Sequence, residues 1–123
     1  MNKDPLTEKI IGFAINVHKE LGPGLLESVY EECLYYEILN SGLLVERQKH
    51  IPIIYKQKIL ESKLVIDLLV ENSLLIELKS VDKLIPVHDA QVISYLKLAK
   101  IHTGLLITFN VKYLVDGIKR FVN

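Results

Sequence analysis

The segment from Val65 to Lys79 constrains the fold more than any other part of the sequence. Two runs rich in Val, Ile and Leu, residues 65–70 and 74–79, flank the short polar sequence Glu71-Asn72-Ser73. This pattern predicts a β-hairpin with both faces covered by other parts of the chain. Its apolar strands nevertheless contain three charged residues that need a physical explanation: Asp67, Glu77 and Lys79.

These charged residues are costly to bury singly. A lone buried carboxylate destabilises a fold by several kcal/mol, so we expect Asp67 and Glu77 to be paired, to bind a metal ion or to reach a cleft. Side chains alternate along a strand, which puts Glu77 and Lys79 on one face. With a tight turn, Asp67 on the antiparallel partner lies near Glu77. Two carboxylates and an ammonium group are therefore expected to converge.

The composition limits the class of protein. Of 123 residues, 50% are hydrophobic, which is enough for a single domain over residues 1–123 with its own core. Equal numbers of basic and acidic residues, 15 of each, argue against nucleic-acid binding through bulk charge unless the positive charge is local. Such a patch would draw on Lys56, Lys58, Lys97, Lys100, Lys119 and Arg120.

Cysteine content and hydropathy bear on the compartment. The single cysteine, Cys33, excludes an internal disulfide and a cysteine-based zinc site, and it fits a reducing cytoplasm. No apolar run reaches the roughly 18 residues of a membrane span, and the first residues lack a signal-peptide pattern. A cytoplasmic protein without a membrane association is expected.

Helical periodicity occupies the first third of the chain. Residues 6–21 follow the start signal Asp4-Pro5, and Gly22-Pro23-Gly24 ends this helix. Residues 25–40 repeat the helical spacing. The positions expected on the buried sides of the two helices are Ile10, Phe13, Ala14, Val17, Leu21, Leu26, Val29, Tyr30, Cys33, Leu34 and Ile38.

Beyond Gly42 the pattern changes to strands. They are predicted at residues 43–51, 53–55, 59–70, 74–79, 104–109 and 118–122, with Pro52 as a break. A third helix is predicted at 87–100, with Val92, Ile93, Leu96 and Ala99 on its buried side. Because this helix crosses over the sheet, the strand after it is expected to pair in parallel with an earlier one. The fold class is therefore α/β (α+β) with a mixed sheet.

Four short motifs stand in order on these predicted elements. They are Gly24-Leu25-Leu26-Glu27-Ser28-Val29-Tyr30, Asp67, Glu77-Leu78-Lys79 and Gln91-Val92-Ile93-Ser94-Tyr95. In their order and residue types the chain resembles the PD-(D/E)XK nuclease superfamily, and within it the small GxxExxY group. Ile66 stands where the superfamily often has proline before the aspartate. The resemblance spans the first helix to the last strand and implies a restriction-endonuclease-like fold, with a mixed β-sheet core flanked by helices.

The resemblance also implies a metal-dependent activity. It implies hydrolysis of phosphodiester bonds in nucleic acid, DNA rather than RNA, with Mg²⁺ or Mn²⁺ as cofactor. The implied metal ligands are Asp67, Glu77, the backbone carbonyl of Leu78 and, directly or through water, Glu27. Such oxygen ligands suit these ions, which keep several waters and bridge to substrate phosphate.

Three further residues have implied catalytic roles. Lys79 would orient the attacking water or neutralise charge that develops in the transition state. Gln91 and Tyr95, four residues apart on one helix face, would hold Lys79 or the nucleic-acid backbone.

Each of these residues also has a purely structural explanation. Lys79 on an edge strand would discourage aggregation, Glu27 would interact favourably with a helix dipole, and Gln91 and Tyr95 would be half-buried helix residues. The alternative functions are a non-catalytic nucleic-acid-binding module of the same fold and a protein-interaction module that forms a homodimer. Since little sequence lies outside the predicted core, we expect a protein partner or oligomerisation to set substrate choice.

Overall fold

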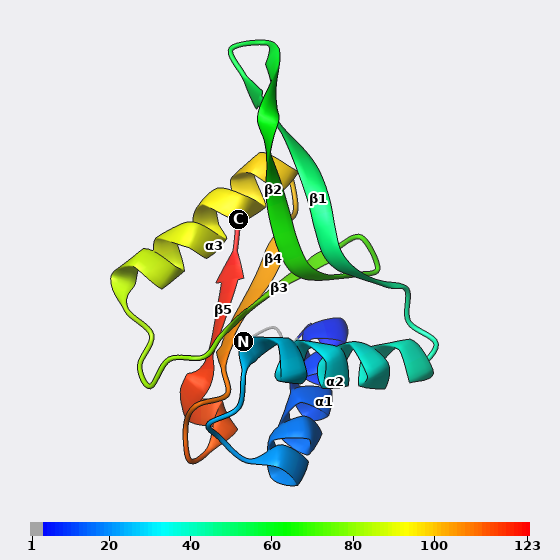
Figure 1. The fold of residues 1–123 in the computed structure, drawn as a ribbon. Coiled ribbons are helices and arrows are strands. Elements are labelled where there is room, and N and C mark those ends of the chain that lie inside the picture. The colour runs from blue at the N-terminus through cyan, green and yellow to red at the C-terminus, as the bar shows by residue number, and fades with distance from the viewer. Residues whose placement is uncertain (1–3) are drawn as a thin grey trace.

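One mixed sheet organises the fold (Figure 1). The computed structural model describes residues 4–123, in which the strands lie in the order β1-β2-β3-β4-β5. Their bounds are β1 Val45–Tyr55, β2 Lys58–Val70, β3 Leu74–Lys79, β4 Thr103–Thr108 and β5 Ile118–Val122. Strands β3 and β4 are parallel, whereas the other neighbouring pairs are antiparallel. The predicted mixed α/β sheet and the parallel pairing after the third helix are thus confirmed.

Helices cover both faces of this sheet. Their bounds are α1 Pro5–Leu21, α2 Glu27–Asn40 and α3 Pro86–Ala99, with a short 3₁₀ helix, η1, at Leu114–Gly117. Helix α1 begins where predicted because the Asp4 carboxylate accepts hydrogen bonds from the Leu6 N–H (3.2 Å) and the Thr7 hydroxyl (2.7 Å). None of the helices within residues 4–123 is both long enough and apolar enough to cross a membrane.

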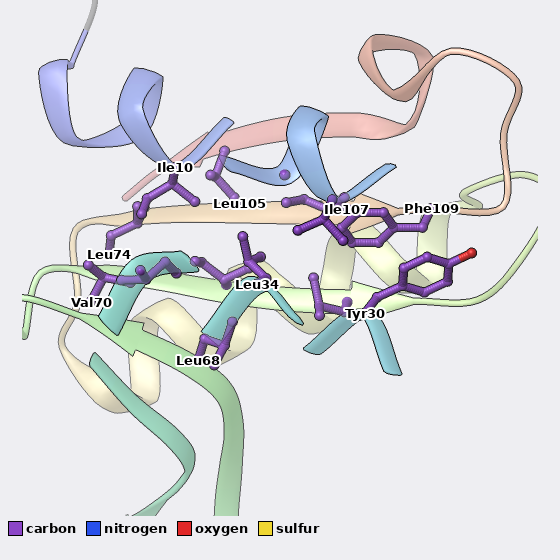
Figure 2. Close-up of a cluster of buried hydrophobic side chains, with 14 of the residues drawn as sticks. Ile10, Tyr30, Leu34, Leu68, Val70, Leu74, Leu105, Ile107 and Phe109 are labelled. Carbon is purple, nitrogen blue, oxygen red and sulfur yellow. The ribbon is translucent and has the colours of Figure 1, made fainter. Parts of the chain in front are cut away.

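The larger core layer lies between the sheet and helices α1 and α2 (Figure 2). Ile10 of α1 and Leu34 of α2 meet Leu105 and the other inward-pointing strand residues there. The rings of Tyr30 and Phe109 stack in parallel, with centroids 4.4 Å apart and 4° between their planes. This layer fixes α2, and with it the start of the helix at Glu27, against the central strands.

The second core layer lies under α3. Val92 and Leu96 pack against Leu75 of β3 and Leu106 of β4. Gly104 allows this close approach, because a Cβ atom there would lie 3.1 Å from Val92 Cγ1 and 3.2 Å from Leu96 Cδ2. With both faces covered, strands β3 and β4 are almost entirely buried, as their apolar composition predicts.

Five expectations about individual residues were wrong, and two of them concern Leu21 and Val29, which are each 37% exposed rather than buried. Pro52 does not break a strand, because β1 lies at the sheet edge, where a missing N–H is tolerated; the register with β2 only shifts between Pro52 and Ile54. Leu26 caps α2 and is 73% exposed rather than buried. Ile93 is 52% exposed, because α3 contacts the sheet along Val92 and Leu96 only.

Strands β1 and β2 continue far beyond the rest of the sheet as a two-stranded arm (Figure 1). We define the arm as residues 49–66, which begin at the cross-strand pair of Lys49 and Ile66. Strand β2 pairs with β3 only through its last three residues, Leu68 to Val70. The point where β2 leaves β3 is therefore also the base of the arm.

Candidate active site

The candidate site lies at the fork where β2 and β3 separate. The last ladder pair before the fork joins Leu68 to Ile76, so the same register places Asp67 opposite Glu77. Ile66 packs in the α3 layer and Leu68 in the opposite layer, although regular alternation would put them on one face. Strand β2 therefore turns about its own axis at Asp67, which directs this strand away from β3.

Beyond the fork, the backbones of β2 and β3 no longer hydrogen-bond to each other, and two side-chain carboxylates accept hydrogen bonds from backbone N–H groups there instead. The Asp67 N–H donates to Glu77 Oε1 (3.2 Å), and the Leu78 N–H donates to Asp67 Oδ2 (2.9 Å). Each carboxylate thus binds a backbone N–H of the opposite strand. The predicted convergence of Asp67 and Glu77 is confirmed by this reciprocal arrangement.

A second set of side chains holds the free oxygen of Asp67. Gln48 Nε2 donates to Asp67 Oδ1 (3.3 Å) and to Glu31 Oε1 (2.6 Å). The buried Glu31 carboxylate also forms an ion pair with Arg47 Nε (2.6 Å). Gln48 has a positive φ of 52°, which is uncommon for a residue with a side chain and indicates local backbone strain.

Sequence reasoning missed Gln48 and Glu31. They belong to β1 and α2, and nothing in their spacing links them to Asp67 before the chain folds. A weak signal existed, since Glu31 follows Glu27 by one helical turn and so lies on the same helix face.

Lys79 and Glu27 contribute to the electrostatics of the fork. Strand β3 is an inner strand of the sheet, although at Lys79 it pairs with Thr108 of β4 and no longer with β2. Partial loss of solvation and the charge of Asp67 raise the pKa of Glu27, whereas Lys79 and a backbone hydrogen bond from Ser80 lower it. Ser80 Oγ also donates to the Leu25 carbonyl (2.9 Å), which ties the end of β3 to the start of α2.

Glu77 is the most perturbed of these groups. Its side chain is 3% exposed, and burial raises its pKa from 4.5 to about 8. The negative charge of Asp67 raises the pKa further, while the Asp67 N–H and Lys79 oppose this rise. Near neutral pH a proton therefore occupies the Glu77 carboxyl group unless a cation replaces it.

Gln91 and Tyr95 lie on α3, above the second core layer. Gln91 Nε2 donates to the Tyr95 hydroxyl (2.9 Å), and Tyr95 packs against the cluster that includes Leu75. Strand alternation puts Glu77 and Lys79 in the same layer as Leu75. Within the described chain the two α3 residues bond to each other rather than to the carboxylates.

The donor set of the fork fits a hard divalent cation. Among residues 4–123, no three or more His, Cys, Asp and Glu side chains gather closely enough to hold a metal ion on their own. Magnesium, however, is commonly bound by one or two carboxylates, with water and substrate phosphate as the other ligands. Asp67 and Glu77 supply such a pair, and a bound cation would stabilise the charged form of Glu77, which burial and the charge of Asp67 disfavour.

A groove elsewhere contains none of the predicted site residues. It has a volume of about 830 Å³, lies between α1 and α2, and includes Val17, Cys33 and Tyr36 in its walls. The two carboxyl groups with raised pKa values, Glu27 and Glu77, lie at the fork, whereas the groove wall includes Arg47, whose pKa is raised by its hydrogen bond to Glu31. The fork is the better candidate because Asp67 and Glu77 meet there through hydrogen bonds to the opposite strands, and burial raises the pKa of Glu77.

Comparison with known families agrees with this geometry. The family model described as the PD-(D/E)XK nuclease superfamily matches residues 4–121. The chain belongs to the PD-(D/E)XK nuclease superfamily. Nucleases of this superfamily act on nucleic acid and typically use divalent metal ions, which makes the protein a candidate phosphodiesterase. No curated protein and no solved structure matches the chain.

Proposed function

We propose that this PD-(D/E)XK protein is a Mg²⁺- or Mn²⁺-dependent nuclease that hydrolyses phosphodiester bonds of DNA. The observation that carries this proposal is the reciprocal pair of hydrogen bonds that places Asp67 and Glu77 together at the strand fork. Superfamily membership over residues 4–121 supplies the reaction class.

The proposed metal ligands are Asp67, Glu77 and the Leu78 carbonyl. In a strand, the N–H and C=O of one residue point to the same side, and the Leu78 N–H points to Asp67. The Leu78 carbonyl is therefore directed towards the same gap as both carboxylates. A divalent ion bound there would polarise the scissile phosphate and lower the pKa of a nearby water.

The other site residues would orient the substrate, hold a water molecule and neutralise developing negative charge. Lys79 lowers the pKa values of Glu27 and Glu77, so its ammonium group is close enough to neutralise charge that develops on phosphate. Glu27, at the start of α2, would hold a water molecule between itself and Asp67. Gln91 and Tyr95 would act as one hydrogen-bonded unit that contacts Lys79 or the substrate backbone.

We further propose that the protein belongs to the GxxExxY group. Gly24 has a φ of 95°, which favours glycine, and Glu27 reaches the fork. The Tyr30 hydroxyl donates to the Gly22 carbonyl (2.5 Å) and accepts from the Leu25 N–H (3.1 Å). Gly24 and Tyr30 thus both help to place Glu27, the third position that names the group, which supports this finer assignment.

Calorimetric titration of Mn²⁺ tests the proposal. The parent protein should bind Mn²⁺ and cut DNA, and Asp67→Asn should lose both properties because a neutral amide is a poor ligand for this ion. Glu46→Gln is the matched control, since it removes a surface carboxylate that pairs only with Lys49.

The substrate arm of the experiment uses single- and double-stranded DNA and RNA. Cleavage of DNA by the parent alone supports the proposal, and cleavage of RNA alone would correct its substrate. If neither protein binds Mn²⁺, the metal-dependent mechanism is wrong, and a non-catalytic module of the same fold takes its place.

A further inference from the structure

The arm is the part of the protein that the catalytic proposal leaves without a task. Its strands extend from the fork to a turn at Lys56-Gln57 (Figure 1). At the base, Ile51 and Ile66 pack in the α3 layer, and the strands continue from there towards the exposed tip. At about 3.3 Å per residue, the strand from Lys49 to Lys56 is roughly 23 Å long. The exposed side chains of such a projection contribute little to the core, which suggests a role in binding.

Positive charge is concentrated on the arm. Residues 49–66 contain four lysines and one acidic residue, Glu61, although the whole chain has a formal net charge of zero. Lys49 pairs with Glu46, whereas Lys58 and Lys63 form no ion pair within residues 4–123. The remainder of the protein is consequently net acidic, and an anionic partner would meet favourable charge chiefly at the arm.

The tip of the arm combines cations with exposed apolar groups. Ile54, Tyr55 and Ile59 are 60%, 59% and 69% exposed. Lys56 Nζ lies 5.4 Å from the centre of the Tyr55 ring, and Lys58 is the cross-strand partner of Tyr55. Lysines beside exposed apolar groups can bind phosphates while the apolar groups contact base edges in a groove of duplex DNA.

The turn at the tip keeps the arm narrow. Lys56 and Gln57 have φ values of 48° and 70°, which define a two-residue turn of the type that matches strand twist. Glycine or asparagine would adopt these angles at lower cost, so lysine at this position is favoured by its side chain rather than by the backbone.

We propose that the arm is a β-ribbon that binds a groove of double-stranded DNA and holds one strand at the fork. This inference rests on the proposed nuclease function and names its substrate class. Asp67 and Gln48 immediately adjoin the first pair of the arm, so DNA bound along the ribbon runs past both residues. The arm thereby supplies the local positive charge that the neutral composition requires of a nucleic-acid-binding protein.

Groove dimensions favour duplex DNA over duplex RNA. The major groove of B-DNA is about 12 Å wide and admits a two-stranded ribbon, whereas that of A-form RNA is deep and too narrow for side chains to read. Strands about 4.8 Å apart, with their side chains, match the wider groove. Single strands offer phosphates but no groove.

Fluorescence anisotropy with labelled nucleic acids tests the arm separately from catalysis. Binding to a duplex of about 20 base pairs is measured in EDTA at several salt concentrations, so that no strand is cut. The parent should bind duplex DNA more tightly than duplex RNA or single strands. The triple variant Lys56→Ala, Lys58→Ala, Lys63→Ala should bind at least about tenfold more weakly, with a salt slope smaller in magnitude by about 2 to 3.

Lys112→Ala is the matched control. Lys112 Nζ also lies 5.4 Å from the ring of its neighbour, Tyr113, but belongs to the segment between β4 and η1 and not to the arm. The Lys112→Ala variant should bind duplex DNA with the same affinity and the same salt slope as the parent. An unchanged slope in the triple variant, or no binding of duplex DNA by the parent, would overturn the proposal. Equal affinity for duplex RNA would overturn the groove assignment.

Two further measurements separate this inference from the proposed function and from dimerisation. The triple variant should bind Mn²⁺ like the parent, because its lysines do not contact the carboxylates. If the parent protein does not bind Mn²⁺, the metal-dependent function is refuted, but the result on DNA binding by the arm still holds. If the triple substitution changes only the sedimentation coefficient, from dimer to monomer, the arm joins two copies of the chain, and the proposal is wrong.

Discussion

The two halves of β3 meet their neighbour β2 in different ways. In the closed half, Leu74, Leu75 and Ile76 pair with β2 through a regular backbone ladder, and all three side chains are fully buried. In the open half, β2 has left, and side-chain carboxylates bind the backbone N–H groups instead. The same strand therefore provides stability at one end and, at the other, where the ladder ends, the carboxylate that we propose as a metal ligand.

The largest expected effect is that of Glu77→Gln, which removes a proposed metal ligand from the open half of β3. We expect kcat for metal-dependent cleavage to fall about a thousandfold, or roughly 4 kcal/mol, because an amide cannot replace a metal-binding carboxylate. Steady-state cleavage assays measure this effect. Glu71→Gln, in the turn at the closed end of the same hairpin, should retain activity, since the Glu71 carboxylate only accepts a hydrogen bond from the Leu44 N–H. Equal losses in both variants would contradict the assignment.

Leu75→Ala should break the closed half without affecting the chemistry. Leu75 is completely buried against α3, and its truncation should lower the free energy of unfolding by about 2–5 kcal/mol. Urea denaturation measures this loss. Well below the unfolding transition, the Mn²⁺ dissociation constant should stay within about threefold of the parent. A much weaker Mn²⁺ affinity in the folded variant would mean that the two halves are coupled.

The pH dependence of stability should reflect the open half of β3, because Glu77 lies there and its pKa changes on folding. Folding raises the pKa of Glu77 from 4.5 to about 8, so between these values the folded protein keeps a proton that the unfolded chain has released. The free energy of unfolding of the metal-free protein should therefore be highest below pH 4.5 as far as this group is concerned. It should fall by roughly 5 kcal/mol as the pH rises from 4.5 to about 8.

Urea denaturation in EDTA at several pH values measures this decrease. Glu77→Gln should remove most of it, because glutamine does not titrate. Mn²⁺ affinity of the parent should increase over the same pH range, since the ion displaces the proton. A stability curve that is identical in parent and variant would show that Glu77 titrates normally.

Gln48→Ala should have a smaller effect on the open half, because Gln48 contacts the Asp67 carboxylate without being a proposed metal ligand. Loss of the amide that holds Asp67 Oδ1 should weaken Mn²⁺ binding by about tenfold. Gln48→Gly removes the same amide, so this variant should lose as much Mn²⁺ affinity as Gln48→Ala. Because glycine adopts the positive φ at lower cost, Gln48→Gly should be more stable than Gln48→Ala by up to about 1 kcal/mol.

Gln57→Gly provides the matched control for Gln48→Gly. Gln57 also has a positive φ, of 70°, but lies at the tip of the arm. Its replacement should change stability without changing Mn²⁺ affinity. If Gln48→Gly binds Mn²⁺ like the parent, Gln48 has a purely structural role.

The local parts of this architecture could be predicted from the sequence. The sequence predicts that Asp67 lies near Glu77, because both residues belong to one hairpin of 15 residues, from Val65 to Lys79, in which side chains alternate between faces. The start of α1 followed from the capping chemistry of Asp4. Helix positions, the parallel crossover and the final strand followed in the same way from periodicity and connection rules.

Non-local relations could not be predicted. Gln48 and Glu31 meet Asp67 only after β1, β2 and α2 have packed together. The tolerance of Pro52 depends on β1 being an edge strand, which is a property of the sheet and not of the segment. Ile93 shows the same limit, because helical periodicity does not reveal how wide a stripe the sheet will cover.

The confinement of both carboxylates to one hairpin determines which insertions the protein can accept. The loops on either side of α3 can vary in length, because no change there alters the register between β2 and β3. One extra residue in the turn at 71–73, by contrast, would move every following side chain of β3 to the opposite face. Glu77 would then point into the layer of Leu34, and an apolar residue would stand opposite Asp67. Length variation among related chains should accordingly be free around α3 and absent from this turn.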